Sequence, residues 1–110
     1  MENKGFDKST ILKLTEMVEY SDNGIISKRV LDKQTGNITL FSFDKGQRLS
    51  EHTAPFDAMV QVIEGEAEIL IDSKPYILSA GNSIIMPANI PHAVNAKEKF
   101  KMILTMIKSD

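Results

Sequence analysis

The sequence predicts an all-β domain, a sandwich or barrel, preceded by a short N-terminal arm. From residue 25 onward, apolar residues fall in short runs that are rich in β-branched and aromatic side chains. Several of these runs alternate apolar and polar residues with a period of two, which is typical of strands. Gly, Pro, Asp, Asn and Ser separate the runs at nearly regular spacing. Many short strands joined by such turns indicate a sandwich or barrel.

Composition limits the classes of protein to consider. The chain has 110 residues, 42% hydrophobic and 25% charged, which is the range of one globular domain. Its net charge is −2, and it has no basic run that would bind a phosphate backbone, so we expect no nucleic-acid partner. No stretch approaches the about 18 apolar residues of a membrane span, so we expect no membrane partner. The absence of cysteine and the charged N-terminus, which is unlike a signal peptide, favour a cytoplasmic protein.

Residues 1–24 form the predicted arm, and residues 25–110 form the predicted barrel domain. Within the arm, four apolar residues follow helical spacing and predict a short helix over Thr10–Tyr20: Ile11, Leu14, Met17 and Val18. The turn-forming sequence Ser-Asp-Asn-Gly at 21–24 then ends the arm.

The barrel domain begins with a predicted hairpin, in which strands at Ile25–Leu31 and Ile38–Phe43 flank a turn at Asp32–Asn37. Six further strands are predicted at Ala58–Ile63, Ala67–Ile71, Lys74–Leu78, Ser83–Met86, His92–Asn95 and Lys101–Ile107. Gly65 predicts a tight antiparallel connection between the first two of these six. The Asp72–Ser73 pair predicts a short hairpin loop before the third.

The two histidines of the chain, His52 and His92, occur in two stretches with a similar pattern. Gly46–Glu68 places a histidine before an apolar strand and a glycine after it. Gly81–Val94 runs from glycine through an apolar segment and prolines to a single histidine. A lone histidine is more often structural than functional, but the matching context of the two predicts two walls of one pocket.

These stretches resemble the two motifs of the cupin superfamily. The first family motif is glycine, five residues, His-x-His, three or four residues, Glu, six residues, glycine. The corresponding positions here are Gly46, His52-Thr53-Ala54, Ala58 and Gly65.

The second family motif is glycine, five residues, Pro-x-Gly, two residues, histidine, three residues, asparagine. Here it is represented by Gly81, Pro87-Ala88-Asn89, His92 and Ala96. The resemblance covers roughly residues 38–107 and implies a double-stranded β-helix, or jelly-roll barrel.

The resemblance also implies a ligand set, from which this chain departs. Metal-binding cupins use two His and a Glu of the first motif and the His of the second; this chain keeps His52 and His92 but has Ala54 and Ala58 at the other two positions. The nearest oxygen donors that could substitute are Asp57 and Gln61. Alternation places both on the face opposite Ala58, unless a bulge after residue 55 turns Asp57 inward.

Two functions follow from this ligand set. In the first, a divalent ion (Zn, Fe, Mn or Ni, not distinguished) is held by His52 and His92, and the barrel binds a small polar or acidic metabolite. The resemblance implies isomerase, dioxygenase or decarboxylase chemistry without selecting one, and whether the protein is an enzyme stays open. The alternative is a non-catalytic binding or sensor protein with a metal-free pocket. Its predicted lining comprises Ala54, Ala58, Val60, Val62 and Val94.

We also expect a homodimer, which the resemblance implies. The candidate contact is the unpaired edge of the predicted strand Ile25–Leu31.

Overall fold

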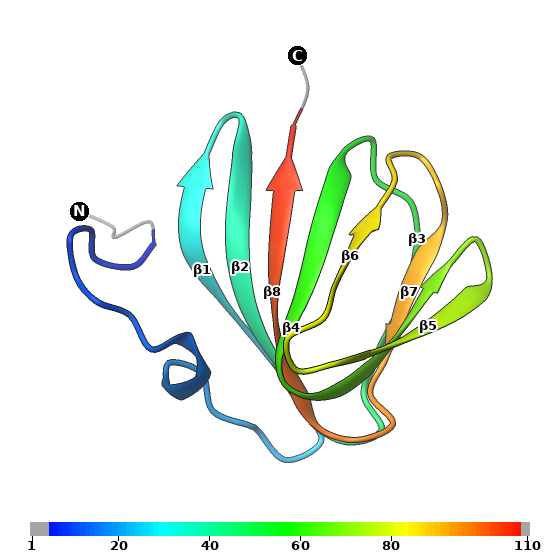
Figure 1. Ribbon diagram of the computed structural model, residues 1–110, viewed down its shortest axis with the longest axis horizontal. Coiled ribbons are helices and arrows are strands. Elements are labelled where there is room, and N and C mark those ends of the chain that lie inside the picture. Colours follow the sequence, from blue (N-terminus) through cyan, green and yellow to red (C-terminus); the bar gives the residue numbers. More distant parts are fainter. Residues whose placement is uncertain (1–4, 109–110) are drawn as a thin grey trace.

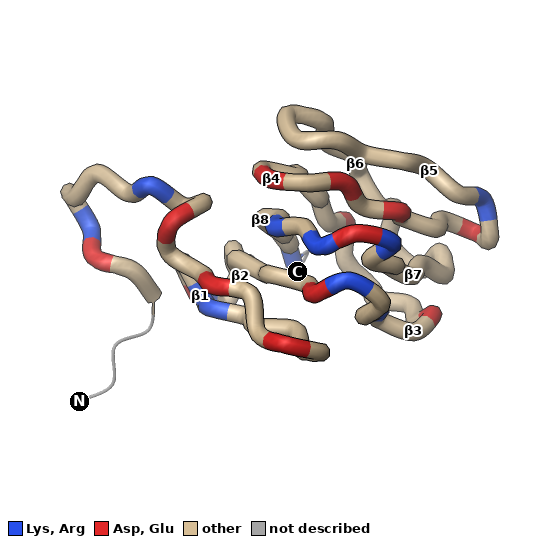
Figure 2. The backbone as a smooth tube through the Cα atoms, turned by 90° about the horizontal axis from the view of Figure 1, so that it is seen from below, with Lys and Arg blue, Asp and Glu red and all other residues tan. Residues whose placement is uncertain are grey.

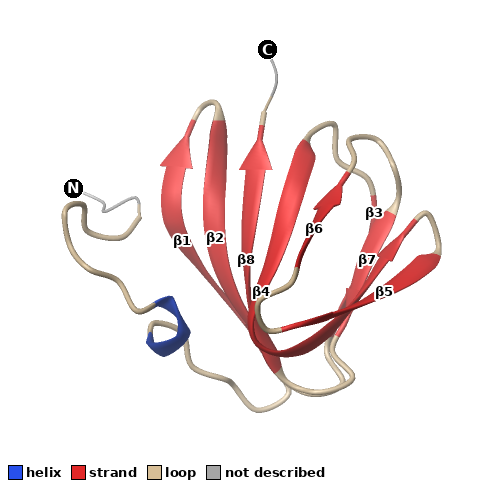
Figure 3. Cartoon of the chain, viewed as in Figure 1, coloured by secondary structure: helices blue, strands red, loops and turns tan. Residues whose placement is uncertain are grey.

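The computed structural model describes residues 5–108, and almost all regular structure in them is β-strand (Figure 3). The strands are β1 (Ile25–Lys33), β2 (Gly36–Phe43), β3 (Arg48–His52), β4 (Asp57–Ile71), β5 (Lys74–Ser79), β6 (Ser83–Met86), β7 (His92–Asn95) and β8 (Phe100–Ile107). The only helical element of this part of the chain is η1, a 3₁₀ turn at Leu14–Glu16. The predicted all-β class is confirmed.

The strands form two sheets that share β4, and every pairing is antiparallel (Figure 1). Sheet A has the order β1-β2-β8-β4-β6, and sheet B has the order β5-β4-β7-β3. The two sheets curl around one interior, so the predicted jelly-roll architecture is confirmed. The predicted hairpin around Asp72–Ser73 is also present, because both residues have positive φ angles (53° and 67°) and Ile71 pairs with Lys74.

The connection predicted at Gly65 is wrong, because residues 57–71 form one continuous strand rather than two strands of a hairpin. The register against β8 shifts between Val62 and Glu64, and Gly65 has a φ of 78°. This irregularity bends β4 out of sheet A and into sheet B. The glycine therefore marks a change of sheet and not a reversal of the chain.

We expect Gly65→Ala to destabilise the fold at this bend. A Cβ at residue 65 would collide with the carbonyl oxygen of Lys99 and lie 3.0 Å from Cα of Phe100, and an L-residue is strained at this φ. The strain alone costs about 1–3 kcal/mol. Urea denaturation measures the loss, and Gly46→Ala is the matched control because φ there is 88° but no atom lies within 4 Å of the added Cβ. Equal losses of stability in both variants would show that the close approach of Lys99 and Phe100 to residue 65 is not the cause.

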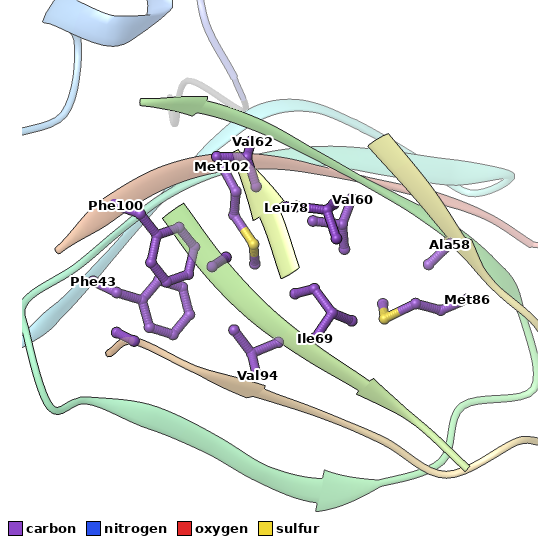
Figure 4. Packing of buried hydrophobic residues seen from close by; sticks show 12 residues of the cluster. Phe43, Ala58, Val60, Val62, Ile69, Leu78, Met86, Val94, Phe100 and Met102 are labelled. Atoms are coloured by element: carbon purple, nitrogen blue, oxygen red, sulfur yellow. The ribbon is translucent and has the colours of Figure 1, made fainter. Parts of the chain in front are cut away.

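The core lies between the sheets and is formed by alternate residues of facing strands (Figure 4). Ala58, Val60 and Val62 all face inward, as alternation predicted. At the other end of the core, the rings of Phe43 and Phe100 stack with centroids 4.6 Å apart and an interplanar angle of 9°.

The arm does not form the helix predicted over Thr10–Tyr20, apart from η1. A helix would require the carbonyls of residues 15–19 to accept bonds from backbone N–H groups one turn later. Instead, Lys101 Nζ donates to the carbonyl of Thr15, Lys28 Nζ to that of Met17 (2.9 Å), and Ser42 Oγ to that of Glu19 (2.7 Å). Tertiary hydrogen bonds thus replace the helical ones. Figure 2 shows the arm on the side of sheet A that faces away from β3, β5 and β7.

The strand β3 was not predicted, since Leu49 is its single apolar residue. Its place at the sheet edge beside β7 explains why so polar a segment is extended: only one of its backbone edges needs a partner.

Candidate functional site

The two histidines lie at neighbouring strand ends. His52 is the last residue of β3, His92 is the first of β7, and the two are paired across the strands. Their ring centroids are 4.3 Å apart at an interplanar angle of 67°, and the Nε2 atoms are 3.1 Å apart. On its other side His92 pairs with Ile71 of β4. Sheet B thus joins two residues that are 40 positions apart in the chain.

Backbone carbonyls fix the orientation and tautomer of both rings. His52 Nδ1 lies 2.8 Å from the carbonyl oxygen of Ser50, and His92 Nδ1 lies 3.3 Å from that of Ile90. A carbonyl oxygen only accepts, so each Nδ1 carries the hydrogen and donates. In the neutral rings both Nε2 atoms are then unprotonated, and two lone pairs face each other across 3.1 Å. This arrangement favours a positive charge between the rings, either a shared proton or a metal cation.

The surroundings of His92 disfavour its protonated form. The residue is 7% exposed, and this burial lowers the pKa of His92 below its ordinary value. The bond to Ile90 opposes that effect, whereas the repulsion from His52 lowers the pKa further. His52 itself lies at the surface. The pair therefore offers one buried and one accessible imidazole, and imidazole binds metals in its neutral form.

The separation of the two nitrogens fits a divalent ion. Zn–N bonds of about 2.0–2.1 Å in tetrahedral geometry place two ligand nitrogens about 3.3–3.4 Å apart, so the 3.1 Å separation would widen by a few tenths of an ångström on binding. Hydrogen bonds from Nδ1 to carbonyls are also the usual support of a metal-binding histidine. However, residues 5–108 contain no cluster of three or more His, Cys, Asp or Glu side chains that could hold an ion together. The described part of the protein would contribute two ligands, and the others would come from solvent or from a bound metabolite.

The two other candidate ligands have different positions. Asp57 pairs with Ile107 in regular register, without the bulge that would turn it inward. Its Oδ1 accepts a hydrogen bond from the backbone N–H of Ala88 (2.9 Å), in the loop before His92. Gln61 lines a surface depression with Gly81 and Ser83, near the β5–β6 connection. Asp57 thus stabilises the loop before His92. Neither Asp57 nor Gln61 lies next to the histidine pair.

Comparisons with known proteins agree with this fold. The family described as Cupin domain matches residues 39–108, well over half of the chain. The chain belongs to the cupin family. No functionally curated protein shows significant similarity to its sequence.

Solved structures show the same fold. A conserved protein of unknown function from Streptococcus pyogenes has 40% identity and a TM-score of 0.91, covering 98% of this chain and 94% of that one. A cupin 2 conserved barrel domain protein from Leptotrichia buccalis has 45% identity and a TM-score of 0.86; the match covers 88% of this chain but 47% of that protein. A salicylate 1,2-dioxygenase from Pseudaminobacter salicylatoxidans has 15% identity and a TM-score of 0.70, covering 76% of this chain and 26% of that one, a likeness of fold alone.

In this cupin, the residues predicted to line the pocket belong mainly to the packed core. Ala58, Val60, Val62 and Val94 are all buried in the main hydrophobic cluster. Ala54 is half-buried, and its carbonyl accepts the N–H of Asn89 (2.7 Å), which links the two histidine loops. Asn89 has a φ of 66°, so it adopts the positive φ that the glycine of the family motif would supply.

Sequence reasoning missed the carbonyls that orient the rings of this cupin. Each belongs to the residue two positions before its histidine, Ser50 and Ile90. Every residue has such a carbonyl, so no side chain could have indicated it. That both carbonyls lie two residues before a histidine becomes apparent only in the structure, where the ends of β3 and β7 lie side by side. No helix of the described residues is long and apolar enough to span a membrane.

Proposed function

We propose that this cupin binds a small acidic metabolite at the His52–His92 end of the barrel, through a divalent cation held by the two Nε2 atoms. The observation that supports this most directly is the pair of facing Nε2 lone pairs 3.1 Å apart, with both Nδ1 atoms already bonded to carbonyls. We also place the protein in the cytoplasm, since its lack of cysteine fits a reducing compartment.

The charge of the site supports an acidic ligand. Two imidazoles are neutral ligands, and the nearest candidate carboxylate, Asp57, is bonded to the Ala88 N–H. A divalent cation would therefore keep its double positive charge beside buried apolar residues, where an uncompensated charge is unfavourable. A carboxylate or chelating oxyanion would neutralise it and occupy positions that the protein leaves open. When bound, such an ion would polarise an oxygen of the metabolite.

The residues of the chain have distinct positioning roles in this proposal. Ser50 and Ile90 hold the rings through their carbonyls, while Asp57 holds the loop before His92 through Ala88. Isomerase, dioxygenase and decarboxylase reactions all remain compatible with this arrangement.

A second candidate is a metal-free binding or sensor protein. The side chains at residues 54 and 58 favour it, because alanines stand where other cupins carry ligands. In that case a proton shared between the Nε2 atoms would give the pair its positive charge, and an anion would bind to it directly.

Calorimetry separates the two candidates. Protein stripped with EDTA is titrated with Zn²⁺, Ni²⁺ and Mn²⁺, each with and without oxalate as an acidic chelating probe. We expect one ion per chain, and we expect His52→Ala and His92→Ala each to weaken metal binding at least about a hundredfold, the effect of losing a ligand or its support. Gln61→Ala is the control that should leave binding unchanged. Oxalate binding without metal, lost in both histidine variants, would support the metal-free alternative and exclude the metal.

A further inference from the structure

The strand pairings show which part of sheet A faces the histidine pair. On one side of β4, the strands β8 and β7 form a continuous partner, because Gly65 pairs with Phe100 and Glu68 pairs with Asn95. In the same way, β2 pairs with β8 and β3 pairs with β7. The strands therefore form one ribbon that is folded over at Gly65. This fold places β2 opposite β3 and β8 opposite β7.

The number of residues from the fold shows what lies opposite the histidines. Ile71, which pairs with His92, comes six positions after Gly65 in β4. About six positions before Gly65, the inward residues of β4 are Ala58 and Val60, and both are buried. The end of sheet B that carries the histidines therefore faces the part of sheet A that contains these two residues.

Two polar side chains of β2 lie at this level. From β4 to β2, the two rows of paired residues are Val60–Leu104–Thr39 and Ala58–Met106–Asn37. Directly paired residues share one face of a sheet, so Thr39 and Asn37 belong to the inner face of sheet A. They lie opposite β3, which ends at His52. The other members of both rows are apolar, so these two side chains are the polar groups of the facing wall.

Thr39 has a buried hydroxyl that the fold itself does not use. The residue is 7% exposed. Neither its Oγ1 nor the side-chain amide of Asn37 forms a hydrogen bond with another residue between 5 and 108. Every fully buried polar side-chain atom of the described residues has a hydrogen-bond partner. The Thr39 hydroxyl is therefore not sealed in the core, and a bound molecule can satisfy it.

We infer that Thr39 and Asn37 make this site selective for carboxylic acids that carry several hydroxyl groups. The inference rests on the proposed function: the carboxylate binds the cation on the histidine pair, and hydroxyls further along the molecule bond to the two side chains of β2. Thr39 and Asn37 are two residues apart on one strand, and hence about 6.5–7 Å apart. A ligand that reaches both needs polar groups along its length. A hydroxyl suits both partners, because it can donate and accept.

The charges beside this wall argue against a second carboxylate on the ligand. Arg29 of β1 pairs with Thr39, and Asp32 pairs with Asn37, so both charged residues belong to the same inner face. The register shift between Arg29 and Leu31 places them on one face although they are three positions apart. Arg29 Nη1 lies 3.3 Å from Asp32 Oδ1, so the two charges offset each other. The wall is polar but neutral, which favours hydroxyl groups.

Calorimetry with two matched acids tests the inference. D-Gluconate and 2-hydroxyhexanoate are both six-carbon 2-hydroxy acids, but only gluconate carries further hydroxyls. We expect the protein to bind gluconate at least about tenfold more tightly. Thr39→Val and Asn37→Leu should each reduce this preference about threefold to tenfold, the effect of one hydrogen bond. Thr105→Val is the matched control and should leave the preference unchanged, because Thr105 pairs with Met59 on the outer face of the same sheet.

Oxalate separates this inference from the proposed function. It is too short to reach β2 from the cation, so Thr39→Val should leave its affinity unchanged. Failure of Zn²⁺-loaded protein to bind oxalate would count against the proposed function. Both six-carbon acids are titrated with and without Zn²⁺, since the wall itself needs no metal. Equal affinities for the two acids in both states, or equal effects of Thr39→Val and Thr105→Val, would overturn the inference.

The stability of the ligand-free protein gives a second readout. Thr39→Val removes a hydroxyl that has no partner in the fold, so we expect it to raise the midpoint of urea denaturation. A lower midpoint would show that the hydroxyl supports the fold, and it would overturn the assignment of Thr39 to ligand binding.

Discussion

Replacing Phe100 with alanine is expected to lower the free energy of unfolding by about 3–5 kcal/mol, the range of large-to-small substitutions in a packed core. Phe100 is fully buried, stacks on Phe43 and pairs with Gly65 at the bend of β4. Its removal leaves a cavity at the end of the core where the two sheets join. Urea denaturation monitored by circular dichroism measures the loss as a lower midpoint.

Phe56→Ala is the matched control for this prediction. Phe56 lies outside the strands, is half-buried and contacts Lys108, whose Nζ is 5.8 Å from the ring centroid. Its loss should cost about 1 kcal/mol or less, since exposed cation–π contacts contribute about that much. Equal losses for Phe56 and Phe100 would show that the Phe43–Phe100 stack does not dominate the core.

Stabilisation of the protein by Zn²⁺ is expected to be largest at the alkaline end of the range from pH 5 to 8 and to decrease as the pH falls. The proposed ligands bind metal only as neutral imidazoles, so protons compete with the metal and weaken its binding as the pH falls. An ion present at 100 times its dissociation constant stabilises the fold by about 2.7 kcal/mol, and this contribution disappears as the dissociation constant rises. Thermal unfolding with and without Zn²⁺, from pH 5 to 8, measures it.

The metal-free protein is the reference for this experiment. Its stability is also expected to decrease as the pH falls, because of His92. Because the folded state lowers the pKa of His92, the unfolded chain binds this proton more readily. The stability contribution of His92 is therefore complete above the ordinary histidine pKa of about 6.5 and decreases as the pH falls toward the lower, folded value. His92→Ala should remove both this dependence and the Zn²⁺ effect. A Zn²⁺ shift that does not decrease as the pH falls would contradict binding through the histidine pair.

Most of the strands could be predicted from the sequence because their inward residues carry the signal themselves. Alternation at Ala58, Val60 and Val62 identified both the strand and its buried face. The failures share one cause, which is that tertiary partners decided the local structure. The sequence predicts a hairpin at Gly65 because a positive φ is compatible with either a turn or a bend, and only the position of β8 distinguishes them. The arm was expected to be helical because its spacing could not reveal that Lys101 and Ser42 would bind its carbonyls.

The sequence predicted which residues form the candidate site, but not how their side chains are oriented. Spacing singled out His52 and His92, and the strands place them in contact. The direction of their lone pairs depends on two backbone carbonyls, and the role of Asp57 depends on an N–H group of Ala88. Backbone groups are the same at every residue, so sequence patterns carry no information about them.

The position of β8 has a consequence for synthesis of the protein. This strand comes last among the described strands, yet it lies between β2 and β4 and is hydrogen-bonded to both. While the chain leaves the ribosome, those two strands have emerged well before the segment that separates them. Their facing edges stay open until β8 arrives, and open strand edges promote aggregation. The emergence of β8 therefore closes the barrel, and a chain that stops before Phe100 would leave both edges exposed.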